Sequence, residues 1–247
     1  MDLCYNAISG VGAAAISEAI KQSQSMITVD LRSNKIGDVG ASALAEAIKQ
    51  SRSLSTVKLH WNAVSDVGVS ALAEAIAQSK SLTSMDLSCN LFDHAGAVAI
   101  ADAIKQNRSL ATVDLSYNEI GQVGAFAIAD AIKQSKSLTK LDLRENSISA
   151  DGISAIFEAI KQSKSPIVVN VCTNEKQKKI QLKHFFVFRL GICEQRKKTK
   201  RASLAPNETA CLFCLVQVFF FPFTLAQRWL NLRKNLCRMR VERNERR

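Results

Sequence analysis

Histidine and cysteine are the residue types in this sequence most able to carry catalysis or bind a metal, and their spacing favours neither. The chain holds 3 His and 7 Cys. His60 and His94 stand in unlike surroundings, and neither an H-E-x-x-H zinc motif nor a G-x-x-x-x-G-K-[ST] phosphate-binding loop occurs. Cys211 and Cys214 form a lone C-x-x-C in an apolar run, whereas a zinc site needs further ligands. The sequence therefore predicts no enzyme, no cofactor and no metal site.

Two other residue types recur at a fixed interval, which is the signature of a repeat protein. Glycine occurs every 28 residues from Gly12 to Gly152. Asparagine follows the same interval, at Asn6, Asn34, Asn62, Asn90, Asn118, Asn146 and Asn174. Because both columns share one register, the chain is built of 28-residue units as far as Asn174. One asparagine in every unit indicates a structural role rather than a catalytic one.

Each unit combines a strand pattern with a helix pattern. In the unit 54–81 the apolar positions follow L-x-x-V-x-L-x-x-N-x-V, and Val57 and Leu59 alternate with Lys58 as in a half-buried strand. A column of residues that favour a helix N-cap comes next, at Ser9, Gly37, Ser65, Asp93, Gly121 and Ser149. Helical spacing then predicts one apolar face, formed in the second unit by Val39, Ala43, Leu44, Ala47 and Ile48.

This pattern resembles the ribonuclease-inhibitor type of leucine-rich repeat, which also forms the sensor arms of NOD-like receptors. The resemblance covers about residues 1–174, as six units and a seventh strand. It implies an α/β solenoid, curved, with a parallel sheet on the concave face and helices on the convex face. It also implies that the Asn side chains satisfy backbone groups in the turns, and we interpret the Gly column as close packing between repeats.

The concave face is the expected partner-binding surface. Three columns point outward there: Asp2, Asp30, Lys58, Asp86, Asp114, Asp142 and Asn170; Cys4, Arg32, His60, Ser88, Ser116, Arg144 and Cys172; and Tyr5, Ser33, Trp61, Cys89, Tyr117, Glu145 and Thr173. The last two columns vary while their surroundings are nearly copied, as a recognition face on a repeated scaffold would. The candidate binding residues are Tyr5, Asp30, Arg32, Lys58, His60, Trp61, Asp86, Asp114, Tyr117, Asp142, Arg144 and Glu145. The alternative is a solvated face with incidental aromatics.

Charge separates the repeats from the rest of the chain. Residues 1–174 carry 15 Lys and Arg against 17 Asp and Glu, a net charge of −2, while residues 175–247 carry 18 against 5, a net charge of +13. The repeats therefore lack the excess of basic residues that is typical of nucleic-acid-binding domains. The odd cysteine count and the absence of a signal peptide ahead of the repeats predict a reduced, cytoplasmic setting.

The tail, residues 175–247, allows several interpretations. Residues 210–226 could form a membrane segment, and the basic amphipathic pattern that follows extends a membrane contact to about residue 241. The basic run 197–200 could be a nuclear-import signal. The aromatic patch 184–188 could cap the last repeat. The remaining hypothesis is that the tail is not a selected domain and arises from intron retention or a frameshift.

The first residue raises a related hypothesis. Met1 aligns with the middle of a strand in the next unit, and no polar cap precedes it. We therefore expect a fragment of a longer protein. The function predicted for the repeats is protein–protein recognition, as in the leucine-rich arm of a NOD-like receptor. Two alternatives stay open: a non-catalytic regulator of a small GTPase, like Ran GTPase-activating protein, and a membrane-anchored repeat protein if 210–226 inserts.

Overall fold

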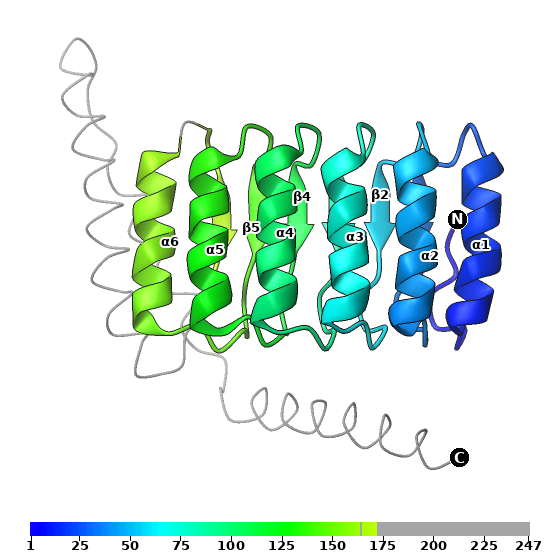
Figure 1. Cartoon of the computed structure of the whole chain (residues 1–247), viewed down its shortest axis with the longest axis horizontal. Coiled ribbons are helices and arrows are strands. Elements are labelled where there is room, and N and C mark those ends of the chain that lie inside the picture. Colours follow the sequence, from blue (N-terminus) through cyan, green and yellow to red (C-terminus); the bar gives the residue numbers. More distant parts are fainter. Residues whose placement is uncertain (164, 172–247) are drawn as a thin grey trace, which may run out of the picture. The chain divides into compact units, whose positions relative to one another are not determined.

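The computed structural model describes residues 1–163 and 165–171. In this part of the chain six helices alternate with six strands (Figure 1). The elements are α1 Gly10–Gln22, β1 Thr28–Asp30, α2 Gly37–Gln50, β2 Thr56–Lys58, α3 Asp66–Gln78, β3 Ser84–Asp86, α4 His94–Gln106, β4 Thr112–Asp114, α5 Gly121–Gln134, β5 Lys140–Asp142, α6 Ala150–Gln162 and β6 Val168–Asn170.

The strands form one parallel sheet in the order β1-β2-β3-β4-β5-β6. Every pairing follows the repeat, since Thr28 pairs with Thr56 and Val29 with Val57, 28 residues apart. The helices stand side by side in one row in front of the sheet (Figure 1). Each repeat thus crosses from sheet to helix layer and back, as in an α/β leucine-rich-repeat solenoid. The predicted fold class is confirmed.

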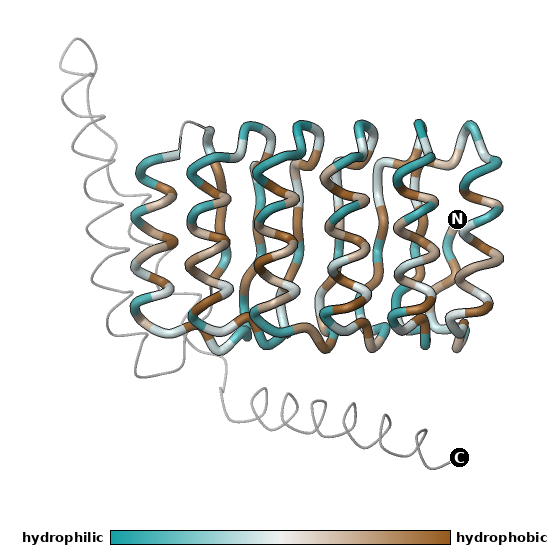
Figure 2. The backbone as a smooth tube through the Cα atoms, in the orientation of Figure 1, coloured by the Kyte–Doolittle hydropathy of each residue, from teal (hydrophilic) through white to brown (hydrophobic). Residues whose placement is uncertain are grey.

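The core lies between the two layers and runs through all repeats. Val57 and Leu59 are buried as the alternation predicts. Each helix carries hydrophobic and hydrophilic stretches along its length (Figure 2). In α2 the buried residues are Gly40, Ala41, Leu44, Ala45, Ala47 and Ile48. Burying each Leu or Ile side chain contributes about 1.5–3 kcal/mol, so stacking supplies most of the stability.

Two predicted core positions, Val39 and Ala43, are wrong, since Ala43 is only half-buried and lies outside the buried set of α2. Val39 is 72% exposed. Gly40 and Ala41 face the core in its place, because the helix can approach its neighbour closely only through small residues. The corresponding Val11, Val67 and Val123 are also exposed, so the apolar face is rotated by about one residue from the prediction.

The predicted N-cap column is also only partly right. The side chains of Ser65, Asp93 and Ser149 accept hydrogen bonds from the first turns of their helices. Ser9 occupies the N-cap of α1 without such a bond. In α2 and α5 the helix begins at the glycine itself, because Gly37 and Gly121 lack a capping side chain and adopt positive φ.

The Gly column packs closely against the preceding repeat, as predicted. A Cβ on Gly40 would lie 2.8 Å from the Cβ of Ala13, and one on Gly124 would lie 2.8 Å from the Cβ of Ala97. Both separations are far shorter than carbon–carbon contact, which is about 3.5–4.0 Å. Glycine is therefore required where neighbouring helices approach each other.

Asn174, Cys172, Thr173 and the entire tail from 175 to 247 lie outside the described residues. The predictions made for 184–188, 197–200, 210–226 and 210–241, and for the lone C-x-x-C, therefore stay predictions. None of the helices in the described part is long and apolar enough to cross a membrane.

Candidate partner-binding face

The Asn column forms a ladder inside the solenoid. The Asn90 side-chain amide donates to the carbonyls of Leu59 and Leu87, at 3.0 Å each, and of Ser88. Its oxygen accepts from the backbone N–H groups of Asn62 and Val64 in the preceding repeat, both at 3.1 Å. Similar bonds recur at Asn34, Asn118 and Asn146. The asparagines therefore satisfy turn backbone within and between repeats, while Asn6 is exposed at the first turn.

The ladder has one interruption, at Asn62. This residue is fully buried and its amide donates to the carbonyls of Leu31 and His60, but its side-chain oxygen has no hydrogen-bond partner among the described residues. The preceding repeat contains Gly37, whose N–H donates to the backbone carbonyl of Asn62 at 3.0 Å. The glycine turn does not explain the interruption by itself, because Gly121 makes the same backbone bond to Asn146, whose side-chain oxygen still accepts the N–H groups of Asn118 and Ile120.

The residues just before the Asn column adopt the left-handed backbone conformation. Their φ angles lie between 53° and 61°, at Tyr5, Ser33, Trp61, Cys89, Tyr117 and Glu145. Non-glycine residues adopt this conformation at a cost of about 1–2 kcal/mol each. We call this set the pre-Asn column. Its backbone is fixed from strand to strand, since the Trp61 N–H donates to the Ser88 carbonyl at 3.0 Å.

The first strand-face column contains five aspartates, which we call the Asp column: Asp2, Asp30, Asp86, Asp114 and Asp142. These residues have a structural role that the sequence did not predict. The side-chain oxygen of Asp86 accepts the backbone N–H of Ser88, and the same i to i+2 bond occurs at Asp2, Asp30, Asp114 and Asp142. These bonds form Asx-type turns at the ends of β1, β3, β4 and β5 and after Asp2, whereas β2 ends at Lys58 and β6 at Asn170. Burial varies along the column: Asp30 and Asp142 are only 4% exposed, Asp86 and Asp114 are half-buried, and Asp2 is exposed.

Ion pairs neutralise the carboxylates of Asp30 and Asp142 on this face. Arg32 Nη2 lies 2.7 Å and Lys58 Nζ 3.2 Å from Asp30 Oδ2. Burial raises the pKa of Asp30, but the hydrogen bonds from Arg32 and Lys58 outweigh it and leave the pKa below its ordinary value. At Asp142 burial likewise raises the pKa, and the hydrogen bonds from Arg144 outweigh it, with Arg144 Nη2 2.8 Å from Oδ2. Asp30 and Asp142, both candidate binding residues, are therefore already paired within the chain.

The middle of the face is different. Asp86 and Asp114 are register partners on β3 and β4. Each accepts a serine hydroxyl of its own repeat, from Ser88 at 2.5 Å and from Ser116 at 2.7 Å. Burial raises the pKa of Asp114, and the neighbouring Asp86 and Asp142 carboxylates raise it further.

His60 joins this centre through a contact that the sequence did not predict. Its Nδ1 lies 2.8 Å from Ser88 Oγ, which also contacts Asp86. The order is histidine–serine–aspartate, with the serine in the middle. A hydrolytic triad instead places the histidine between the serine and the acid. The three residues therefore form a polar bridge across β2 and β3.

The structure brings the predicted binding residues onto one face with unequal exposure. Tyr5 is 71% exposed at the first repeat, Arg144 is exposed, and Trp61, His60 and Glu145 are half-buried. These residues come from equivalent positions of successive repeats, so they follow one another along the sheet in strand order.

A second set of inter-repeat contacts was missed. Asp38, in the first turn of α2, accepts from the N–H groups of Ser65 and Gly68 at the start of α3, at 2.7 and 3.1 Å. Asp66 accepts from Asp93 and Gly96 at the start of α4, at 3.0 and 2.7 Å. An acidic residue in a first turn predicts stabilisation of its own helix; only the structure shows that it caps the next one.

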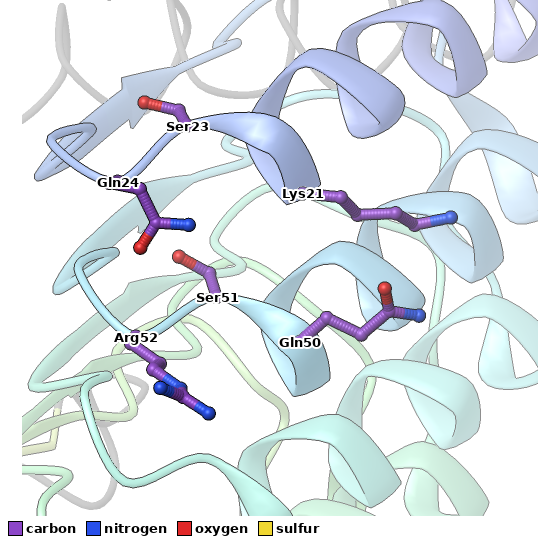
Figure 3. A pocket seen from close by; sticks show the side chains of 6 residues that line it. All are labelled: Lys21, Ser23, Gln24, Gln50, Ser51 and Arg52. Carbon is purple, nitrogen blue, oxygen red and sulfur yellow. The ribbon is translucent and has the colours of Figure 1, made fainter.

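A polar hollow of about 330 Å³ lies away from the strand face, where α1 and α2 end (Figure 3). Loops and last turns line it, with Lys21, Ser23, Gln24, Gln50, Ser51 and Arg52. The C-terminal ends of helices carry partial negative charge, so Lys21 and Arg52 lie where cations stabilise α1 and α2. None of the predicted binding residues lines this hollow.

The repeats match a known family. Models of the Leucine Rich repeat match residues 22–45, 50–73, 78–101, 106–129 and 134–157. Together with the strand–turn–helix geometry, these matches establish the chain as a leucine-rich repeat protein. Such domains generally serve as non-catalytic interaction modules.

Solved structures share the fold. "Leiomodin-1 Actin-Binding Site 2 (ABS2)" is similar with a TM-score of 0.53 and 19% identity, over 68% of this chain and 92% of that one. The tropomodulin C-terminal domain from Caenorhabditis elegans is similar with a TM-score of 0.50 and 15% identity, over 70% and 98%. A comparison with curated proteins gave no match.

Proposed function

We propose that the repeats recognise a protein partner through the strand face, without catalysis of their own. The pre-Asn column carries this proposal. Tyr5, Trp61 and Tyr117 hold large side chains in a backbone conformation that disfavours them. The same conformation recurs at Ser33, Cys89 and Glu145, so the repeat enforces it and holds the side chains of the column at fixed positions along the face.

The frame beneath these side chains supports the same function. The Asn ladder and the Asx turns bond the backbone on both sides of the pre-Asn column. Side chains on a fixed backbone lose little conformational freedom when a partner binds. Trp, Tyr and Arg, which dominate binding energy at interfaces, are all present in the two variable columns.

A capture experiment with the full-length chain tests this proposal. Trp61→Ala and Tyr117→Ala should each remove the same proteins from the captured set, as measured by quantitative mass spectrometry. Phe126→Ala is the matched control, since Phe126 is a 44% exposed aromatic on α5. Actin, which the leiomodin-1 title names, belongs in a direct binding panel. The proposal is refuted if the unaltered chain and both strand-face variants capture the same proteins in the same amounts.

The finer expectations stay proposals of the same kind. Resemblance to the NOD-like receptor arm, a cytoplasmic location and the division at residue 174 agree with the repeat pattern. Regulation of a small GTPase is the alternative function, and faster GTP hydrolysis in the presence of the chain would favour it over plain recognition.

A further inference from the structure

Two aromatic residues flank the centre of the strand face. Trp61 and Tyr117 occupy the pre-Asn column two repeats apart, with the smaller Cys89 between them. Backbone bonds keep the three in register, from Trp61 to Ser88, from Cys89 to Ser116 and from Tyr117 to Arg144. Adjacent strands lie about 4.8 Å apart, so the two aromatic positions are separated by about 10 Å. The position of Cys89 lies between the two aromatic positions in the column.

The charge beside these aromatics indicates which side chain fits. Within residues 1–163 and 165–171, the ion pairs of the strand face involve Asp30 and Asp142, and neither Asp86 nor Asp114 takes part in one. Asp86 and Asp114 face each other across adjacent strands, an arrangement of like charges that destabilises a sheet. Lys58 is the register partner of Asp86, and Arg32 and Arg144 lie near this pair, but the direct ion pairs of these three cations go to Asp30 and Asp142. A further positive charge beside Asp86 and Asp114 would reduce their mutual repulsion.

The pKa of Asp114 agrees with this description. Burial raises it, and the Asp86 and Asp142 carboxylates add to the increase. At neutral pH the ionised carboxylate is thus held in unfavourable surroundings, which a nearby cation would improve.

We infer that the strand face binds a basic segment of its partner, with one Lys or Arg side chain inserted between Trp61 and Tyr117 above Asp86 and Asp114. The carboxylates accept charge-assisted hydrogen bonds from the cation. The aromatic rings contact its aliphatic stem and attract its charge. This inference rests on the proposed function, because it assigns the chemistry of the partner at the same face.

A small cationic probe tests the inference on the full-length chain. N-acetyl-arginine amide is titrated into protein carrying Trp229→Phe, so that the indole N–H signal in the NMR spectrum comes from Trp61 alone. N-acetyl-citrulline amide is the neutral isostere. The arginine probe should shift the indole signal saturably and bind at least fivefold more tightly than the citrulline probe. Equal binding of the two probes, or no binding of either, would overturn the inference.

Substitutions then locate the charge. Asp86→Asn with Asp114→Asn keeps oxygen atoms that can accept the serine bonds and should weaken the arginine probe at least fivefold. Asp102→Asn with Glu158→Gln removes the same charge from the helix side and should leave binding unchanged. Equal losses in both double variants would contradict the assignment. Because the two-probe comparison uses unaltered carboxylates, it remains decisive even if the Asp86/Asp114 variant unfolds.

The two proposals fail in different ways. If Trp61→Ala removes captured proteins but the arginine and citrulline probes bind alike, the strand face binds a partner of other chemistry and the inference is wrong. If the probe prefers arginine but no captured protein depends on Trp61, the cation site exists and the recognition function is wrong.

Discussion

The interrupted Asn ladder allows a direct test of how the turns are stabilised. Asn90 makes five side-chain hydrogen bonds, and Asn62 makes two. Replacing either with Ala removes a buried amide of the same size. The difference between the two variants therefore reports hydrogen bonding rather than packing.

The expected magnitudes follow from the groups left unpaired. Asn90→Ala deprives the N–H groups of Asn62 and Val64 of their acceptor, and each buried unpaired donor costs about 1–3 kcal/mol. Asn62→Ala leaves the Leu31 and His60 carbonyls with other donors, from Asn34 and Ser33, and it removes an oxygen that already lacked a partner. We expect Asn90→Ala to destabilise by at least about 2 kcal/mol more than Asn62→Ala.

Denaturant unfolding of the full-length chain, followed by far-UV circular dichroism, measures both variants. Thermal unfolding should separate their midpoints by about 4–8 °C for a cooperative unit of this size. Equal losses, or a larger loss at Asn62, would show that the side-chain oxygens contribute little and that the ladder acts only through its amide donors.

Three further outcomes are expected. Gly96→Ala should destabilise by about 1–3 kcal/mol in denaturant titration, because the new Cβ would lie 2.7 Å from Asp66 Oδ1; a neutral result would show that Asp66 moves freely. Ser33→Gly should raise the thermal midpoint, because it relieves a φ of 56° and removes a buried hydroxyl that has no hydrogen-bond partner among the described residues. These gains should exceed the cost of about 0.5–1 kcal/mol from the greater freedom of glycine in the unfolded chain. A lower midpoint would show that the left-handed backbone at Ser33 is not strained. Asp114→Asn should stabilise by about 0.2–1 kcal/mol at pH 7 by removing a cross-strand repulsion. The pKa of Asp114 is raised in the folded state, so its ionised carboxylate destabilises the fold fully above that pKa and progressively less as the pH falls toward 3.8. The stability gained by Asp114→Asn should therefore shrink on acidification. A gain that does not depend on pH would refute the electrostatic cause.

The repeat fold could be predicted because its determinants are local and recur. The Asn and Gly columns fix the period, and the alternation around Val57 and Leu59 identifies the strand. Side-chain direction was harder to predict. Helical spacing places Val39 on the same face as Leu44 and Ile48. In the structure Gly40 and Ala41 instead pack against the neighbouring helix, and Val39 is exposed to solvent.

The candidate face could be located from the sequence but not described in detail. The variable columns identify which residues lie there, whereas the left-handed backbone at Trp61 and Tyr117 depends on bonds to neighbouring repeats. The Asp column was expected to face a partner. The structure instead shows i to i+2 bonds and ion pairs at Asp30 and Asp142. The repeat pattern alone cannot predict these contacts, because the same column position is compatible with an exposed carboxylate.

The caps supplied by Asp38 and Asp66 have a consequence for cooperativity. Each links the start of one helix to the side chain of the previous one, so α2, α3 and α4 are coupled in a chain. The equivalent positions in other repeats hold Gly10, His94, Gln122 and Ala150, which cannot form the same carboxylate cap. Repeat proteins behave as a row of units joined by nearest-neighbour terms. We expect the α2–α4 block to open last in hydrogen exchange, with Trp61 inside it, while the terminal repeats open first.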